Sequence, residues 1–183
     1  MAMADDPITD LIYIEHTSKV NEQENLDFRA FVKTELDLSD YRLHGIVKQT
    51  TEEVWTHIDC RTCANCCKTR HPLFSRVEVQ RIADYLGLTA AELRARYLEI
   101  DQEAAKYITR ELPCPFLKDN LCSIYDVRPS VCAGYPHLHR NFRNRLWQTI
   151  DNAETCPIVF NVLERLKHRL GFRDTQIRHG RRQ

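Results

Sequence analysis

The sequence predicts a small, mainly α-helical single domain whose short helices surround irregular, cysteine-bearing loops. Three observations support this fold class: a helical periodicity of apolar residues before the first cysteine, two capping-box signatures in the middle of the chain, and a proline- and turn-rich stretch at 113–136. The chain has 183 residues and is 43% apolar, enough for one modest core. We expect the loops to enclose a metal or iron–sulfur site, with at most one short β-hairpin.

The charge pattern and the ends of the chain suggest three segments. Residues 1–25 are acidic and polar and are expected to be loosely ordered or to lie over the domain. Residues 26–171 form the cysteine-cluster domain, and residues 172–183 form a basic tail. The acidic and basic ends could attract each other. The N-terminus has neither the basic region nor the apolar run of a secretory signal, and no stretch approaches the ~20 apolar residues of a membrane helix. The sequence therefore predicts a cytoplasmic protein with no membrane segment.

Two helices are expected before the first cysteine. One begins near Leu26 and buries Phe28, Phe31 and Val32. The next covers about 40–58, because apolar and small residues recur there at the spacing of one helical face. That face consists of Leu43, Val47, Thr50, Val54 and Ile58.

The middle and the end of the chain predict three more helices. Ser75 with Glu78 and Thr89 with Glu92 are capping boxes, which start helices over 75–86 and 90–98. Gly87 is placed to end the first of them in a left-handed conformation. Pro157 starts a last helix over 157–170.

One antiparallel strand pair is also expected, between residues 107–112 and 145–150.

The cysteines dominate the chemistry of the chain. Four of them form a C-x2-C-x2-C-C run and four follow singly, and we interpret all eight as metal ligands rather than as disulfides or unligated buried thiols. A cytoplasmic location favours this interpretation, because thiols stay reduced there. The eight residues are Cys60, Cys63, Cys66, Cys67, Cys114, Cys122, Cys132 and Cys156.

The spacing leaves the cofactor open between an iron–sulfur cluster, [4Fe-4S] by preference, and zinc. The first three cysteines have ferredoxin-like spacing, whereas a closed zinc site would use two C-x2-C-type pairs. Eight thiols could also serve two centres. Cys132 and Cys156 lie near expected helix starts, which would favour their thiolate forms.

Cys67 is the exception in the cysteine run. It has no x2 partner of its own, and its side chain is expected to point away from that of Cys66. It is either a ligand of a second centre or a spare thiol. His137 and His139, beside Cys132, are expected to be spare or to support the ligands rather than to bind metal.

The order of these motifs resembles a known family. A CPFL element at Cys114, a C-x-IY element at Cys122, an RP-x2-C element ending at Cys132, a YP pair and a late Cys-Pro follow the C-x2-C-x2-C-C run. Over about residues 58–157 the chain is similar to the YkgJ-type cysteine-cluster proteins, which carry a zinc- or iron-chelating CxxCxxCC domain. It differs at Ala133, where the family often has arginine, and at the pair Ala64-Asn65, where a glycine is frequent.

The resemblance implies a metal or iron–sulfur site without a settled reaction. Some relatives join the cluster to a flagellin lysine-methylase, and others are described as iron–sulfur oxidoreductases. The expected function is therefore a redox or cluster-dependent enzymatic role, and the alternative is a zinc-stabilised structural or interaction module. The sequence has no G-x-G-x-x-G or P-loop motif and no paired-carboxylate or Ser-His-Asp arrangement, so no catalytic residue is assigned. Nucleic acid is not expected as a partner, because no aromatic-interleaved basic stripe is present. The protein partner, the substrate and the oligomeric state stay open.

Overall fold

The structure, a computed structural model, describes residues 6–138 and 141–173 and separates the chain into two compact units. Residues up to 59 and from 136 onward form the first, called here the helical unit; residues 60–135 form the second, the cysteine unit. The described elements are mostly helices, with two short antiparallel strand pairs, which confirms the mainly α fold class. The single domain expected over 26–171 stays a prediction, and each unit is described by itself.

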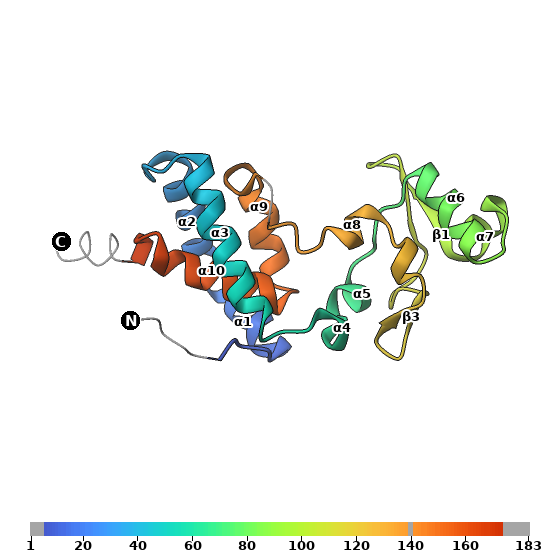
Figure 1. Ribbon diagram of the computed structural model, residues 1–183, viewed down its shortest axis with the longest axis horizontal. Coiled ribbons are helices and arrows are strands. Elements are labelled where there is room, and N and C mark those ends of the chain that lie inside the picture. The colour runs from blue at the N-terminus through green and yellow to red at the C-terminus, as the bar shows by residue number, and fades with distance from the viewer. Residues whose placement is uncertain (1–5, 139–140, 174–183) are drawn as a thin grey trace. The chain divides into compact units, whose positions relative to one another are not determined.

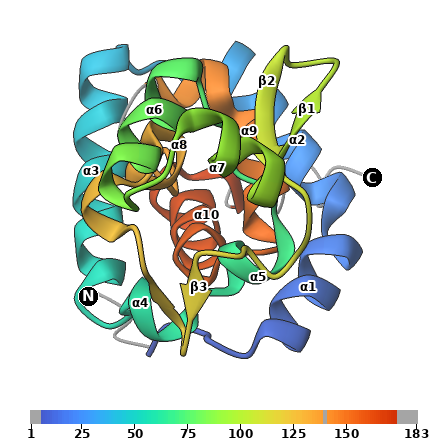
Figure 2. The same cartoon turned by 90° about the vertical axis from the view of Figure 1, so that its right-hand side faces the viewer.

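The helical unit is built around its last helix (Figures 1 and 2). Helix α10 contacts α1, α3 and α9, and nearly all of its first two turns is buried. As predicted, Pro157 occupies its first turn. The helices of this unit are α1 (Leu11–Val20), α2 (Glu22–Thr34), α3 (Asp40–Trp55), α9 (Phe142–Ala153) and α10 (Pro157–Arg169).

The structure corrects two sequence-based expectations in this unit. The segment 1–25, expected to be loosely ordered, contains helix α1, because Asp10 caps its first backbone N–H groups and Ile14 is fully buried. Residues 145–150, expected as a strand, lie in α9. Their burial follows a helical spacing through Leu146 and Thr149, which outweighs the short apolar alternation that suggested a strand.

Ion pairs join the acidic start of the helical unit to its basic end, as the charge pattern suggested. Lys167 is completely buried, and its Nζ lies 3.2 Å from a Glu24 carboxylate oxygen and 2.6 Å from one of Glu164. Arg173 pairs with the same two glutamates. Two acids and two bases therefore satisfy one another between α2 and α10. Residues 174–183, most of the expected basic tail, lie outside the described residues.

The cysteine unit has a small core on which short elements are arranged. Eight buried residues form this core, including Phe74, Ile82, Phe116 and Ile124, and the predicted capping boxes start both of its longer helices. Gly87 has a φ of +66°, as expected for a left-handed helix end. Its elements are α4 (Cys60–Cys63), α5 (Asn65–Thr69), α6 (Arg76–Tyr85), α7 (Ala90–Tyr97), β1 (Leu98–Asp101), β2 (Lys106–Thr109), β3 (Leu117–Lys118), β4 (Leu121–Cys122), a 3-10 turn (Tyr125–Val127) and α8 (Ser130–Ala133).

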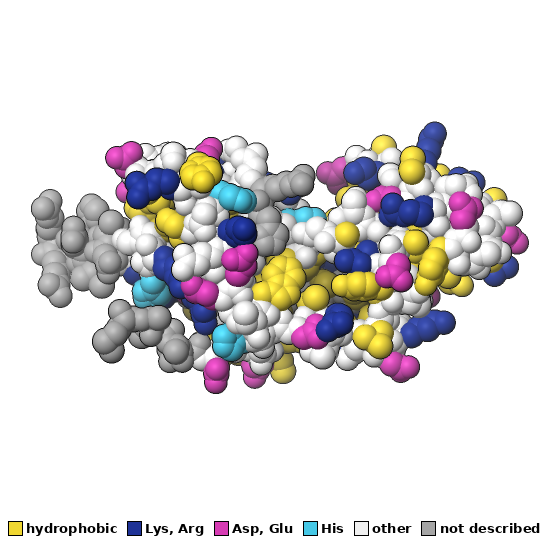
Figure 3. All heavy atoms as spheres, in the orientation of Figure 1, with side chains coloured by type: hydrophobic (Ala, Val, Ile, Leu, Met, Phe, Trp, Pro, Cys, Tyr) yellow, Lys and Arg dark blue, Asp and Glu magenta, His cyan; other side chains and the backbone are white. Residues whose placement is uncertain are grey.

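The strand predicted at 107–112 is present as β2, but its partner is β1 rather than residues 145–150. Leu98 pairs with Thr109 and Asp101 with Lys106, so a short connection after α7 closes a local hairpin. In the described part of the chain, no helix is long and apolar enough to cross a membrane. On the face drawn in Figure 3, basic and acidic side chains are interspersed.

Candidate metal centre

The first four cysteines lie on two short helical turns separated by a left-handed residue. Helix α4 begins at Cys60 and ends at Cys63, Ala64 has a φ of +50°, and α5 carries Cys66 and Cys67. The Ala64 N–H donates to the Cys60 carbonyl (3.0 Å), and the Cys67 N–H donates to the Ala64 carbonyl (3.0 Å). The break at Ala64 redirects the chain between the second and third cysteines. Glycine adopts such a positive φ without strain, whereas the Cβ of Ala64 makes it costly.

Cys114 and Cys122 lie on a tight hairpin. The Leu117 N–H donates to the Cys114 carbonyl (2.9 Å), Leu117 pairs with Cys122 across β3 and β4, and Asp119 and Asn120 form the turn with φ values of +49° and +63°. Positive φ at both central residues is the geometry that two-residue hairpins favour. The sequence analysis did not identify this hairpin. The sequence signal for this hairpin was the pair Asp119-Asn120, which lies between Lys118 and Leu121.

This hairpin docks on the first cysteine segment. The Cys114 N–H donates to the carbonyl of Cys67 (2.8 Å), and the Asn120 side-chain amide donates to the carbonyl of Thr62 (3.4 Å). Cys67 and Cys114 are therefore joined by backbone although 47 positions separate them in the chain. Both cysteines of the hairpin pack against the core of the unit.

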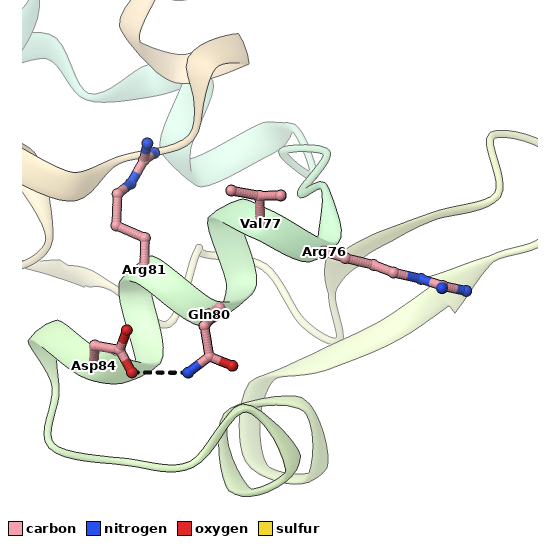
Figure 4. Close-up of a pocket in the computed structure, with 5 residues that line it drawn as sticks. All are labelled: Arg76, Val77, Gln80, Arg81 and Asp84. Carbon is pink, nitrogen blue, oxygen red and sulfur yellow. Dashed lines mark hydrogen bonds between the residues drawn. The ribbon is translucent and has the colours of Figure 1, made fainter.

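Helix α6 holds the segment that carries Cys132. The Glu78 carboxylate accepts a hydrogen bond from the Ser130 N–H (2.7 Å), and the Arg81 guanidinium donates to the carbonyl of Arg128 (3.1 Å). In Figure 4 the Arg81 side chain extends from α6 toward this neighbouring segment, on the wall of an open hollow of about 560 Å³. The capping box predicted Glu78 only as a local partner of Ser75. No sequence signal indicated its bond to Ser130.

Four thiols of the cysteine unit are close enough to influence one another's ionisation. Burial, followed by the charges of Cys67, Cys114 and Cys122, raises the pKa of Cys132 to about 12. Burial likewise raises the pKa of Cys114 to about 11, with Cys67 and Cys122 acting in the same direction. Burial is also the main cause that raises the pKa of Cys122, and Cys67 adds to it. Each of these three thiols is thus affected by Cys67, and the four form one electrostatic group.

Backbone N–H groups act on two of these sulfur atoms in the opposite direction. The N–H groups of Phe116 and Leu117 lower the pKa of Cys114 as hydrogen-bond donors, and the N–H of Ile124 does the same for Cys122, although burial dominates in both. Donors two residues after a cysteine stabilise negative charge on its sulfur. The hairpin is therefore prepared to hold thiolates once another positive charge offsets their burial.

Cys67 differs from the other three. A hydrogen bond from the Cys66 thiol lowers its pKa to about 7 against the opposing effect of burial, and Lys68 contributes in the same direction. The expectation that the side chains of Cys66 and Cys67 point apart is wrong. Adjacent residues of a helix do not normally face each other, but the hydrogen bond from the Cys66 thiol brings the two sulfur atoms together on α5.

The remaining residues that the sequence analysis considered for the site lie in other environments than these four thiols. Cys60 is exposed, and Cys63 and Cys66 are half-buried. Cys156 occupies the N-cap position of α10, as predicted, without a side-chain capping hydrogen bond. It belongs to the helical unit and is buried there. His137 is half-buried in the helical unit, and His139 lies outside the described residues.

The expectation that a helix start favours the thiolate form of Cys132 is wrong. Cys132 does follow a start at Pro129, but α8 has only four residues and burial dominates, so the pKa of the thiol is raised rather than lowered.

A comparison with protein families identifies the chain. Residues 59–157 match the model of the CxxCxxCC family, described as "Putative zinc- or iron-chelating domain". The chain belongs to this family. The match covers more than half of the sequence and all eight cysteines, and it confirms the resemblance read from the motifs. The protein is therefore a metal-binding cysteine-cluster protein. No curated protein matches the chain. No solved structure matches it either.

The donors present fit such a metal by their chemistry. Thiolates are the preferred ligands of zinc and of iron–sulfur clusters, and four of them share one region of the cysteine unit. Within residues 6–138 and 141–173, no three cysteine, histidine or acidic side chains are grouped as tightly as a single metal ion needs. The fit therefore rests on donor chemistry and electrostatic coupling.

Proposed function

We propose that the cysteine unit binds an iron–sulfur cluster, [4Fe-4S] by preference, through the thiolates of Cys67, Cys114, Cys122 and Cys132. The observation that carries this proposal is the docking of the Cys114–Cys122 hairpin on Cys67, whose carbonyl accepts a hydrogen bond from the Cys114 N–H at 2.8 Å. In agreement with it, the charge of Cys67 raises the pKa of Cys114, Cys122 and Cys132. Four cysteine thiolates are also the ligand set of a [4Fe-4S] cluster. The protein would act in the cytoplasm, in a redox or cluster-dependent enzymatic role.

The chain's own residues would define the properties of such a centre. A bound cluster supplies one-electron redox chemistry. The N–H groups of Phe116, Leu117 and Ile124 stabilise charge on the hairpin sulfurs, and the packing of Cys114 and Cys122 against the core limits water around them. Arg128 lowers the pKa of Cys122 and Cys132 and adds positive charge beside them. The N–H groups and Arg128 favour the more negatively charged, reduced state, whereas packing away from water opposes it.

The sulfur atoms would have to converge when the cofactor binds. Burial keeps Cys114 and Cys132 protonated at neutral pH, so binding would also release protons. Cofactor binding and the final folding of the cysteine unit would then be one process.

Cys60, Cys63 and Cys66 stay candidates for a second centre. They keep the ferredoxin-like spacing, and two of them bound helix α4. Cys156 also stays a candidate ligand.

A zinc-stabilised module is the second candidate function. The observation in its favour is that Cys114 and Cys122 border the small core of the cysteine unit, so a closed four-thiolate zinc site there would hold the fold together. The protein would then bind a partner without catalysing a reaction. A strong chelator should unfold residues 60–135 in that case, because zinc binding supplies folding free energy.

Metal analysis separates the two functions. The protein is purified without oxygen, and its visible absorption, iron, acid-labile sulfide and zinc are measured. The iron–sulfur proposal predicts a brown protein with broad absorption and about four iron and four sulfide per chain. A colourless protein with stoichiometric zinc and no sulfide would refute it in favour of the zinc module.

A further inference from the structure

The Glu78 carboxylate connects helix α6 to the turn that carries Cys132. One carboxylate oxygen accepts a hydrogen bond from the Ser130 N–H at 2.7 Å, across 52 positions of sequence, and the Ser130 hydroxyl donates as well. Ser130 is the first residue of α8, two positions before Cys132. The Glu78 side chain is only 9% exposed, while Ser130 is exposed, so the bond to Ser130 is partly shielded from water.

The second carboxylate oxygen of Glu78 is committed to the capping box. It accepts from the Ser75 N–H at 2.8 Å and from the Ser75 hydroxyl at 2.7 Å. The side chain therefore cannot rotate to improve one contact without losing the other. Arg81, one turn further along α6, donates to the carbonyl of Arg128, so the helix holds this segment at two points.

The chain contains a matched counterpart in helix α7. Glu92 occupies the same position in its capping box and accepts from the Thr89 N–H and hydroxyl, both at 2.8 Å. Its side chain is exposed, and within the described residues its recorded hydrogen bonds stay inside that box. Glu78 and Glu92 thus share the capping-box role and differ in burial and in the bond to Ser130.

We infer that Glu78 is a positioning residue of the metal centre, holding Cys132 through Ser130 where its thiol can join those of Cys67, Cys114 and Cys122. This inference rests on the proposed thiolate centre. A capping role alone accounts for the bonds to Ser75 but not for the bond to Ser130. A carboxylate is needed because only it offers acceptor oxygens to both serines at once.

Two substitutions break this connection in different ways. In Glu78→Gln the amide oxygen can still accept the capping-box hydrogen bonds from Ser75. The amide nitrogen then faces the Ser130 N–H, and because both groups are donors, no hydrogen bond forms between them. Ser130→Pro removes the N–H and hydroxyl donors and keeps Glu78. The backbone accepts this proline, because Pro129 has φ −57° and ψ 152° and Ser130 is the first helical residue. Glu92→Gln is the matched control.

The test is a titration of the reduced, metal-free protein with Co²⁺ under anaerobic conditions, followed by thiolate-to-cobalt charge-transfer absorption. Co²⁺ takes the tetrahedral thiolate sites that zinc uses and reports on the sulfur ligands directly. We expect Glu78→Gln and Ser130→Pro to bind Co²⁺ on the order of tenfold more weakly than wild type, and Glu92→Gln to match wild type. In a Cys132→Ser background, Glu78→Gln should weaken binding no further, because the two changes act through one ligand.

The outcomes separate the inference from the function on which it rests. If Glu78→Gln and Ser130→Pro both match Glu92→Gln, the positioning role is overturned and the thiolate centre stands. If Glu78→Gln weakens binding equally with and without Cys132, it acts through general stability and the inference is again overturned. If wild type shows no thiolate–cobalt absorption, the thiolate centre fails and the inference falls with it. Ser130→Pro keeps the test decisive if Glu78→Gln does not fold.

Discussion

At the scale of single residues, the thiols of the centre are not chemically equivalent. Cys67 has a pKa of about 7, whereas burial raises the pKa of Cys114 to about 11 and that of Cys132 to about 12. In the reduced, metal-free protein at pH 7.5, iodoacetamide should therefore modify Cys67 on the order of a hundredfold faster than Cys114 or Cys132. Peptide mass spectrometry over time measures these rates. Equal rates at the three sites would contradict the assigned burial and coupling.

Ala64 is the residue at which backbone conformation matters most. Its φ of +50° is strained for a side chain with a Cβ and severe for a β-branched one. Ala64→Val should destabilise the protein by about 2 kcal/mol. Ala64→Gly should be nearly neutral, because relief of strain offsets the loss of one buried methyl group worth about 0.8 kcal/mol. Urea unfolding midpoints measure both, and a well-tolerated valine would show that the left-handed turn is absent.

Glu78 gives the fold a defined response to acid. Burial opposes its ionisation, but hydrogen bonds from Ser130 and Ser75 outweigh burial and lower its pKa from 4.5 to about 2. Because the folded pKa is depressed, the stability it contributes is present above pH 4.5 and is lost as the pH falls toward 2. The free energy of unfolding should therefore fall less steeply over this window in Glu78→Gln than in wild type. Parallel pH profiles would contradict this.

At the scale of elements, a buried ion cluster joins α2 to α10. Lys167 is fully buried against Glu24 and Glu164. Lys167→Met should destabilise the protein by about 3 kcal/mol, because it leaves two acids with Arg173 as their remaining basic partner in the cluster. Lys19→Met, at the exposed pair with Glu15, is the control and should change stability little. Thermal unfolding of the two variants compares them, and similar losses would refute the special role of Lys167.

The elements also show which parts of the structure sequence patterns predict. The helices over 75–86, 90–98 and 157–170 were predictable because capping residues and apolar spacing are local signals. The hairpin of Cys114 and Cys122 was missed because strands of two residues have no alternation to detect. The bond from Glu78 to Ser130 depends on tertiary packing, which no local pattern encodes.

The candidate site was predictable in its composition but not in its grouping. All eight cysteines were identified as ligand candidates from their number and spacing, and the family match covers them. Spacing alone grouped the first three as a ferredoxin-like set. In the structure, Cys67 is hydrogen-bonded by the Cys66 thiol and also acts on Cys114, Cys122 and Cys132, because the Cys114 hairpin is hydrogen-bonded to the Cys67 backbone.

At the scale of the whole molecule, the two units should respond differently to the cofactor. The four coupled thiols all belong to residues 60–135, and α10 has its own core in the helical unit. Removing the cofactor should therefore speed amide hydrogen exchange in residues 60–135 and leave α3, α9 and α10 nearly unchanged. Mass spectrometry of the loaded and stripped protein measures this. Equal deprotection of α10 would indicate that Cys156 takes part in the centre.

The most direct test of the shared thiolate centre is the iron, sulfide and zinc content of single Cys→Ser variants, each purified without oxygen. Cys67→Ser, Cys114→Ser, Cys122→Ser and Cys132→Ser should each lose most of the bound metal, because each removes one of four thiolates that act together. Cys60→Ser, at the exposed end of the cysteine run and outside these four ligands, should keep the metal of the shared centre. Full metal content in Cys67→Ser together with loss in Cys60→Ser would contradict the grouping.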